Sequence, residues 1–259
     1  CARRPPDPPL PVAPAVSAMD TGRAVPGPAR EASQFDLMRE RRFAPFFWTQ
    51  FLGAANDNVF KNALVIFVAF QAAGMTSMDP NTLVNLAGAV FIAPFMLLSA
   101  MGGQLADKFE KSRLIRAIKL FEIAIMVVGL AGFWMRDLAT LFAALALMGV
   151  HSTLFGPVKY AILPQHLKPE ELVGGNGLVE MGTFVAILAG TIAGGLVVGT
   201  GPNGPLWAGA LAIAIAVAGW FASRAIPETP AVDPNLALAW NPFTETWRNL
   251  VFASRTRVV

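Results

Sequence analysis

A group of polar side chains interrupts an apolar run that is long enough to cross a lipid bilayer. The run extends from about residue 45 to residue 73, and its middle carries Asn56, Asp57, Asn58, Lys61 and Asn62. A helix that enters hydrocarbon near residue 46 would place Asp57 roughly 17 Å along its axis, close to the bilayer midplane. Each ionisable side chain at that depth costs roughly 2.5–3.5 kcal/mol on insertion scales. These groups must therefore face a helix bundle or a water-filled cavity.

The spacing of these polar residues indicates which of them share a helix face. Asp57 and Lys61 are four residues apart, as are Asn58 and Asn62, so each pair stacks along the helix. One interpretation is an internal Asp57–Lys61 ion pair that only lowers the cost of insertion. The other is a functional site, because ionisable groups inside the membrane generally mark a pathway. We assign Asp57, Asn58 and Lys61 to a substrate or gating site.

The composition is that of a membrane protein. Apolar residues make up 54% of the chain and charged residues 14%, against about 25% charged in a typical soluble domain. The net charge is +3, and the basic residues lie between apolar spans, so nucleic acid is not an expected partner. Cys1 is the only cysteine, which excludes an internal disulfide and a metal site built on cysteines. We expect no cofactor.

Six apolar segments of membrane-spanning length predict an all-α membrane protein. The expected spans are residues 45–73, 82–102, 114–134, 138–158, 175–199 and 205–223. Residues 1–34, rich in Pro, Ala and Arg, are expected to be a disordered extension that precedes a transmembrane unit of residues 35–225. Residues 226–259 are expected to form a cytoplasmic linker, with an interfacial segment around Trp240 and Trp247.

Basic residues alternate between the two sets of connections. One set carries Arg39, Arg41, Arg42, Lys108, Lys111, Arg113, Arg116, Lys159, Lys168 and Arg224. The other set carries only Arg136. Because basic residues accumulate on the cytoplasmic side, this alternation predicts that both ends of the chain are cytoplasmic.

The second span ends in a charged motif, Gly103-Gln-Leu-Ala-Asp107-Lys108-Phe-Glu-Lys111-Ser-Arg113. It resembles the loop between the second and third helices of the major facilitator superfamily, with Glu110 where that family usually has glycine. We expect Gly103 to allow close helix approach, Asp107 to accept hydrogen bonds or pair with a cation, and the basic residues to stay at the anionic leaflet. The alternative is an ordinary charged cytoplasmic turn. The resemblance implies a role in conformational gating.

Two further sets of charges are expected to pair. Arg116, Lys119 and Glu122 lie three residues apart on one helix face, and we expect the deeper Glu122 to pair with Lys119. The alternative is that Arg116 and Lys119 extend to the headgroups. Lys159 follows Gly156-Pro157, and Pro164 comes after it, so we expect the helix to break or kink there. Glu180 lies about 9 Å along the next helix from Gly174. We therefore expect Lys159 and Glu180 to form an ion pair or a switch, the alternative being a Lys159 that extends to the headgroups and an independently solvated Glu180.

Glycines of the fifth span predict close packing against another helix. Gly190 and Gly194, and then Gly195 and Gly199, are four residues apart, so each pair presents a smooth strip on the helix surface.

The chain resembles one family over about residues 33–225, the bacterial lysophospholipid transporters of the major facilitator superfamily. The most specific elements are Asp57-Asn58 and Pro157-Val-Lys159-Tyr160, and other matching stretches are residues 34–37, 41–43, 50–54, 93–95, 104–107, 176–180 and 186–190. The resemblance implies two six-helix halves around a central cavity, of which this chain supplies the first, so it is expected to be truncated and not to transport alone. It also implies an inner-membrane location and lysophospholipid as substrate.

The nearest versions of this family are fused ahead of an acyltransferase and an acyl-ACP synthetase that re-acylate the imported lipid, which implies these as partners. An alternative is a facilitator for a small polar metabolite or a drug. An integral membrane acyltransferase is disfavoured, because such enzymes generally need His-x-x-x-x-Asp, and Gly156 and Glu171 follow five residues after His151 and His166. We therefore expect a transporter and no enzyme within these residues.

Overall fold

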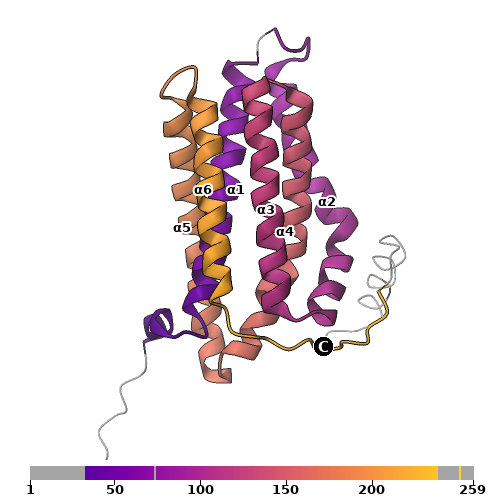
Figure 1. Ribbon diagram of the computed structural model, residues 1–259, viewed down its shortest axis with the longest axis vertical. Coiled ribbons are helices and arrows are strands. Elements are labelled where there is room, and N and C mark those ends of the chain that lie inside the picture. The colour runs from indigo at the N-terminus through magenta and orange to yellow at the C-terminus, as the bar shows by residue number, and fades with distance from the viewer. Residues whose placement is uncertain (1–32, 73, 239–250, 252–259) are drawn as a thin grey trace, which may run out of the picture. The chain divides into compact units, whose positions relative to one another are not determined.

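The computed structural model describes residues 33–72, 74–238 and 251, and the regular elements of these residues are helical (Figure 1). Two short 3-10 helices are η1 (Gln34–Arg39) and η2 (Pro169–Glu171). The six long helices are α1 (Ala44–Phe70), α2 (Pro80–Lys108), α3 (Lys111–Met135), α4 (Leu138–His166), α5 (Leu172–Val198) and α6 (Gly204–Arg224). Each overlaps one predicted span, so the all-α prediction is confirmed.

Acidic side chains cap the N-termini of three of these helices and so fix where they begin. Asp79 accepts a hydrogen bond from the Thr82 N–H at the start of α2, where Pro80 occupies the first turn. Glu110 and Asp137 cap α3 and α4 in the same way. Such side chains satisfy N–H groups that have no partner within the helix, and proline lacks the N–H that would be orphaned there.

Four of the long helical segments meet the length and composition expected of a membrane span. These are α2, α4, α6 and the stretch Pro169–Val198 that joins η2 to α5. The remaining two long helices, α1 and α3, pack inside the same bundle. Their polar side chains meet inside it, because the Asn56 amide of α1 donates to the Glu122 carboxylate of α3.

Of the break or kink expected near the end of the fourth span, the break does not occur. Helix α4 continues through Pro157 and Pro164 to His166, so Lys159 lies within a helix. The structure makes room for the first proline ring, because Gly102 of α2 has no side chain and a Cβ there would lie 3.3 Å from Pro157 Cγ. Neighbouring helices can support a proline inside a membrane helix in this way.

Helix α1 packs extensively against α5 and α6 (Figure 1). The predicted glycine strip is confirmed for Gly190 and Gly194, whose Cα atoms face the α1 main chain at Ala55 and Val59; a Cβ on Gly194 would lie 2.7 Å from the Val59 oxygen. In the second predicted pair, Gly195 also faces α1, where a Cβ would lie 3.1 Å from Asn62 Nδ2, whereas Gly199 faces only its own helix. Close backbone contact therefore fixes the rotation of α1 beside its polar residues.

Two apolar clusters divide the bundle along its length. One contains Phe60, Ile125 and Met148, and the other contains Phe46, Ile118 and Val158. Buried polar residues of α1, α3 and α4 lie between the two clusters. They are Asn56, Lys119, Glu122 and His151. The core is thus apolar at both ends and polar in a layer between them.

The segment after α6 folds back across the α2–α3 connection. The Lys111 N–H donates to the Thr229 oxygen at 3.0 Å, and the N–H groups of Val232 and Asp233 donate to the Asp107 main-chain oxygen at 2.9 and 3.0 Å. Residues 226–238 are therefore anchored to the bundle. The predicted interfacial segment around Trp240 and Trp247, and most of the predicted 1–34 extension, lie outside the described residues.

Candidate functional site

The polar layer is centred on Glu122, whose side chain is completely buried. Its carboxylate accepts a hydrogen bond from the Asn56 amide at 2.8 Å and forms an ion pair with Lys119 one turn earlier on α3. The predicted Lys119–Glu122 pair is confirmed. The alternative, in which Lys119 extends to the headgroups, does not occur, because only 1% of its surface is exposed. The pair is internal to the protein.

His151 of α4 lies beside this pair, and sequence reasoning missed it. Its Nε2 is 3.4 Å from a Glu122 oxygen, and its ring stacks on Phe155 with centroids 6.3 Å apart. The imidazole is 3% exposed, yet neither ring nitrogen has a hydrogen-bond partner among the described residues. A histidine inside an apolar span was the available signal, since ionisable residues within membrane helices generally serve a function.

Asp57 bonds across to α4 rather than along its own helix. Ser152 Oγ donates to Asp57 Oδ2 at 2.8 Å, while the buried Oδ1 has no hydrogen-bond partner within residues 33–72 and 74–238. No ion pair joins Asp57 to Lys61; the Lys61 ammonium instead lies 4.5 Å from the centroid of the Phe91 ring on α2. The interpretation of α1 as carrying an internal ion pair is therefore wrong.

Asn58 and Asn62, which were predicted to stack along α1, bond to different partners instead of to each other. The Asn58 amide donates to the Ala54 oxygen at 2.7 Å, one turn back on α1. The Asn62 amide crosses to α5 and donates to the Thr191 oxygen at 2.7 Å. Asn62 therefore holds α1 against α5, next to the glycine strip.

Lys159 and Glu180 form the predicted ion pair between α4 and α5. The Lys159 ammonium is 3.2 Å from a Glu180 oxygen and also donates to Thr183 Oγ1 at 2.9 Å. The Tyr160 hydroxyl donates to the same Glu180 oxygen at 2.7 Å. Tyr160 and Thr183 were not predicted as site residues, because hydroxyl groups on apolar helices give a weak sequence signal. The pair is half open to its surroundings, with the Glu180 side chain 42% exposed.

A cavity of about 310 Å³ connects these groups on the face of the bundle that α1, α2, α4 and α5 share. Of the predicted substrate or gating residues, Asp57, Asn58, Lys61 and Lys159 line it, and Glu180 reaches it through its pair with Lys159. Its other walls include Lys119, His151, Ser152, Phe91, Phe95, Phe155, Thr183 and Ile187. Charges of both signs thus meet aromatic and aliphatic walls in one cavity, as expected of a ligand site.

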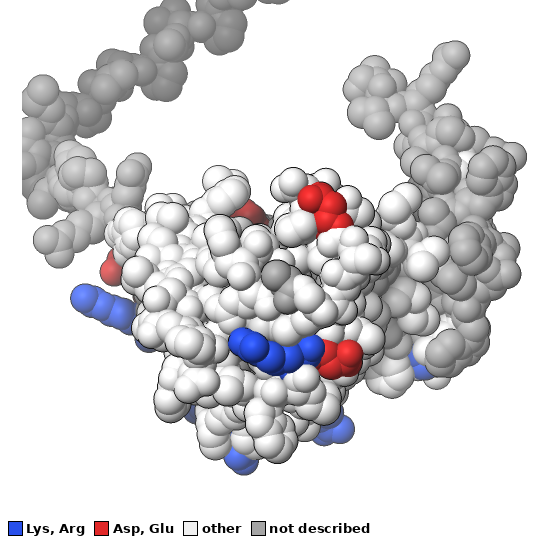
Figure 2. All heavy atoms as spheres, turned by 90° about the horizontal axis from the view of Figure 1, so that it is seen from above, with Lys and Arg blue, Asp and Glu red and all other residues white. Residues whose placement is uncertain are grey.

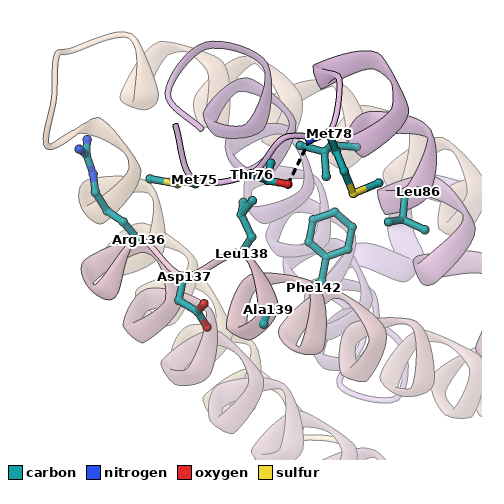
Figure 3. Close-up of a pocket in the computed structure, with 10 residues that line it drawn as sticks. Met75, Thr76, Met78, Leu86, Arg136, Asp137, Leu138, Ala139 and Phe142 are labelled. Carbon is teal, nitrogen blue, oxygen red and sulfur yellow. Dashed lines mark hydrogen bonds between the residues drawn. The ribbon is translucent and has the colours of Figure 1, made fainter. Parts of the chain in front are cut away.

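A larger pocket, of about 490 Å³, lies at the other end of α4 and contains none of the predicted site residues. Figure 3 shows Met75, Thr76 and Met78, from the α1–α2 connection, near Leu138 and Phe142 of α4. The carboxylate of Asp137 in its wall is already used to cap α4, accepting from the Thr140 N–H at 2.8 Å. The smaller cavity is the better candidate, because the buried ionisable groups collect there.

The predicted conformational loop departs from expectation at several positions. A Cβ on Gly103 would meet nothing within 4 Å, and the close helix approach is made by Gly102, whose Cβ would lie 2.8 Å from the Thr153 oxygen. The Asp107 carboxylate is exposed and forms no ion pair within the described part of the chain. Lys108 donates to the Leu236 oxygen at 2.8 Å.

The two remaining basic residues of the loop have opposite environments. Lys111 is completely buried, with its ammonium 3.4 Å from the Pro230 oxygen, so it is not at the headgroup layer as expected. Residues 226–238 cover it, which the sequence pattern did not indicate. Arg113 is exposed beside Glu110, at 3.6 Å.

Glu110, which replaces the usual glycine, serves as a helix cap. Its φ of −61° is ordinary, so the turn does not require glycine. Burial raises the pKa of the Glu110 carboxyl, but hydrogen bonds from Thr229, Ser112 and Arg113 outweigh burial and lower that pKa below its usual 4.5. Since the folded-state pKa is depressed, the cap stabilises the protein above about pH 4.5 and loses that contribution as the pH falls further.

The described residues contain no group of three His, Cys, Asp or Glu side chains that could hold a metal ion.

We expect Glu122→Gln to destabilise the bundle much more than Glu180→Gln. The first change leaves Lys119 charged and unpaired inside the protein, which typically costs 3–5 kcal/mol. The second removes a half-exposed partner, for which about 0–1 kcal/mol is expected. Thermal unfolding of the two variants in matched detergent micelles measures the difference. Equal shifts in the unfolding temperature would contradict the assignment of Glu122 as the centre of the buried layer.

Known proteins similar to this chain are membrane transporters. Relatives named lysophospholipid transporter LplT occur in Serratia proteamaculans (strain 568), with 32% identity over 193 residues, and in Salmonella heidelberg (strain SL476), with 31% over 208 residues. These alignments cover 74% and 77% of this chain but 44% and 48% of the relatives. The chain thus spans about half the length of the curated relatives it matches.

Two solved structures share the helix arrangement. A peptide transporter POT (E310Q mutant), crystallised in complex with sulfate, matches 89% of this chain and 46% of its own, with a TM-score of 0.60 and 23% identity. A bacterial homologue of the iron transporter ferroportin, in an outward-facing state, matches 74% of this chain and 52% of its own, with a TM-score of 0.53 and 17% identity. At these identities the likeness concerns the fold.

The sequence pattern of the Major Facilitator Superfamily matches residues 43–256, which is most of the chain. Together with the six-helix bundle and its internal polar layer, this match shows that the chain belongs to the Major Facilitator Superfamily.

Proposed function

We propose that this chain forms one half of a transporter that moves lysophospholipid across a bacterial inner membrane by alternating access. The observation that carries the proposal is the cavity, in which Asp57, Lys61 and Lys159 lie among aromatic and aliphatic walls. A lysophospholipid has a phosphate, often an amine, and one acyl chain. The lysines suit the phosphate, Asp57 suits the amine, and the apolar walls suit the beginning of the acyl chain.

The choice of lipid over a small polar metabolite or drug is supported by the names of the relatives, which are lysophospholipid transporters. An acyltransferase role within these residues is not favoured, because the similar proteins are transporters and the required histidine motif is missing from the sequence. The proposed gate is the ion pair between Lys159 and Glu180, and its position between α4 and α5 supports this role. Breaking and re-forming this pair would accompany the change of access.

A second six-helix half is part of the proposal. Exposed apolar side chains on α2 and α5, such as Ile92, Met96, Phe184 and Leu188, give that half a surface to contact beside the cavity. An acyltransferase and acyl-ACP synthetase, fused or associated, would use the imported lipid. Sequencing the gene beyond codon 259 tests both ideas, and finding neither six further spans nor a His-x-x-x-x-Asp motif would oppose them.

The proposed orientation places both ends of the residue 35–225 unit in the cytoplasm. The end of the bundle seen in Figure 2 bears mainly uncharged residues, with few charged side chains. Among the described connections at that end, Arg136 is the only basic residue. This distribution agrees with the positive-inside rule.

The orientation predicts that a cysteine introduced at Asn203 reacts with a membrane-impermeant thiol reagent added to the periplasmic side. Asn203 precedes α6 at the end with few basic residues. A cysteine at Lys168 is the matched control and should react only after the inner membrane is opened. The reverse pattern would overturn the orientation.

Asp57→Asn should abolish lysophospholipid uptake while leaving membrane insertion intact. The change preserves size and the contact with Ser152 but removes the charge that faces the cavity. Uptake of labelled lysophosphatidylethanolamine by the full-length protein, at matched expression, is the measurement. Asp233→Asn, in the exposed segment after α6, is the control and should transport normally. Near-normal uptake by Asp57→Asn would show that the carboxylate is only structural.

A further inference from the structure

The larger pocket, of about 490 Å³, contains no residue of the proposed transport site and lies where two helix connections meet. Met75, Thr76 and Met78 border it from the α1–α2 connection, and Arg136 and Asp137 border it from the α3–α4 connection (Figure 3). Both connections join helices of the transmembrane unit at one end of the bundle, so the pocket lies at the level of one membrane surface. A ligand of this pocket would therefore come from the headgroup layer or the adjoining water.

Arg136 is held in a backbone conformation that residues with a side chain disfavour. Its φ of 52° and ψ of 40° are left-handed, and in the described part of the chain it is the one residue other than glycine with a positive φ. The Asp137 N–H donates to the Gly132 oxygen at 3.0 Å, an arrangement that ends α3 and that commonly has glycine where Arg136 stands. Glycine would adopt this turn at lower cost. The turn therefore does not explain the arginine, and its guanidinium group is the part that needs a role.

The polar groups that the pocket leaves unused are hydrogen-bond donors. The Arg136 guanidinium forms no hydrogen bond or ion pair within the described residues. The Thr76 hydroxyl accepts from the Met78 N–H at 3.2 Å, so its own proton remains available. The Asp137 carboxylate, by contrast, already accepts from the N–H and the hydroxyl of Thr140, and its charge lies at the N-terminus of α4, where the helix dipole favours it. Two free donors beside an occupied acceptor favour an anionic ligand.

The remaining wall of the pocket is apolar and partly open to the surroundings. Met78 is 43% exposed and Leu86 is 40% exposed, and Leu83, Leu138 and Phe142 complete this side. Methionine side chains are flexible and adapt to irregular partners, as the varied acyl chains of a membrane require. The pocket thus joins a cationic end to an apolar flank. A glycerophospholipid has the matching order of groups, a phosphate followed by acyl chains.

We propose that this pocket binds a resident diacyl phospholipid of the surrounding bilayer. Its phosphate accepts from Arg136 and Thr76, and the beginning of one acyl chain lies against Met78, Leu86 and Phe142. A diacyl lipid is favoured over a transported lysophospholipid because it is the bulk component of a bilayer, so mass action fills a surface site with it. The pocket also shares no residue with the smaller, charged cavity.

The bound lipid would link the α1–α2 connection to the α3–α4 connection and so stabilise this end of the bundle. The inference does not depend on lysophospholipid being the transported substrate.

The test uses the full-length protein in lipid nanodiscs that contain a trace of phosphatidylglycerol with a photoreactive diazirine near the carboxyl end of one acyl chain. After illumination, mass spectrometry should find more adducts on residues 75–86 than at Val127 of α3, which is 51% exposed and reports ordinary contact with the bilayer. Arg136→Gly removes the charge and suits the turn. It should lower the yield at residues 75–86, relative to Val127, about fivefold, as expected for the loss of one exposed charge pair.

Two matched controls separate the phosphate contact from general contact with lipid. Arg136→Lys keeps the charge and should keep most of the labelling at residues 75–86. Diacylglycerol with the same photoreactive chain has no phosphate and should label residues 75–86 no more than Val127. An unchanged ratio in Arg136→Gly, or an excess of diacylglycerol adducts at residues 75–86, would overturn the inference. Displacement of the phosphatidylglycerol probe by an equimolar amount of lysophosphatidylethanolamine would assign the pocket to the substrate and would overturn the resident lipid.

Thermal unfolding gives a second readout in which charge and backbone act in opposite directions. In detergent without phospholipid, Arg136→Gly should unfold at the same temperature as the wild type or higher, because glycine relieves the left-handed turn. Added phosphatidylglycerol should raise the unfolding temperature of the wild type and of Arg136→Lys more than that of Arg136→Gly, because a ligand stabilises the folded form that binds it. An equal rise in all three proteins would contradict binding at Arg136.

Discussion

The arrangement of the bundle depends on the cost of burying charge. Glu122 is completely buried in a helix that packs inside a membrane protein, so its charge must be compensated within the protein. Lys119 supplies the opposite charge and Asn56 a hydrogen bond. Because these partners come from α3 and α1, the relative depth of the two helices is fixed by the requirement that the three groups meet. The apolar clusters above and below then close the layer from both ends.

From this layer the functional arrangement follows in sequence. Gly190 and Gly194 let α5 lie against the main chain of α1, which fixes the rotation of α1 and directs Asp57 toward α4. The cavity forms where α1, α2, α4 and α5 do not fill the space between them. The charged side chains in the cavity wall are already held in place by the folded bundle. They therefore need little reorganisation when a charged headgroup binds.

Sequence reasoning predicted the helices, the Lys119–Glu122 and Lys159–Glu180 pairs, and a polar site around Asp57. These succeed because helix length, periodicity and charges at matched depth are local properties. The alternative Asp57–Lys61 ion pair does not form, because Lys61 lies over Phe91, and the expectation that Lys111 stays at the headgroups was wrong, because residues 226–238 cover it. The environment of each lysine depends on a segment that is distant in the sequence and packs against it. His151 was missed as a site residue for the same reason, since its significance comes from Glu122 on another helix.

The central claim is that Asp57, Asn58 and Lys61 of α1 face a cavity that is open to water instead of lipid. A nitroxide label at Asn58, in the cavity wall, and another at Val127, which is 51% exposed on α3, compare the two environments in the full-length protein. Relaxation by a water-soluble nickel chelate should dominate at position 58, and relaxation by oxygen, which concentrates in hydrocarbon, should dominate at position 127. Oxygen dominating at both positions would contradict the account.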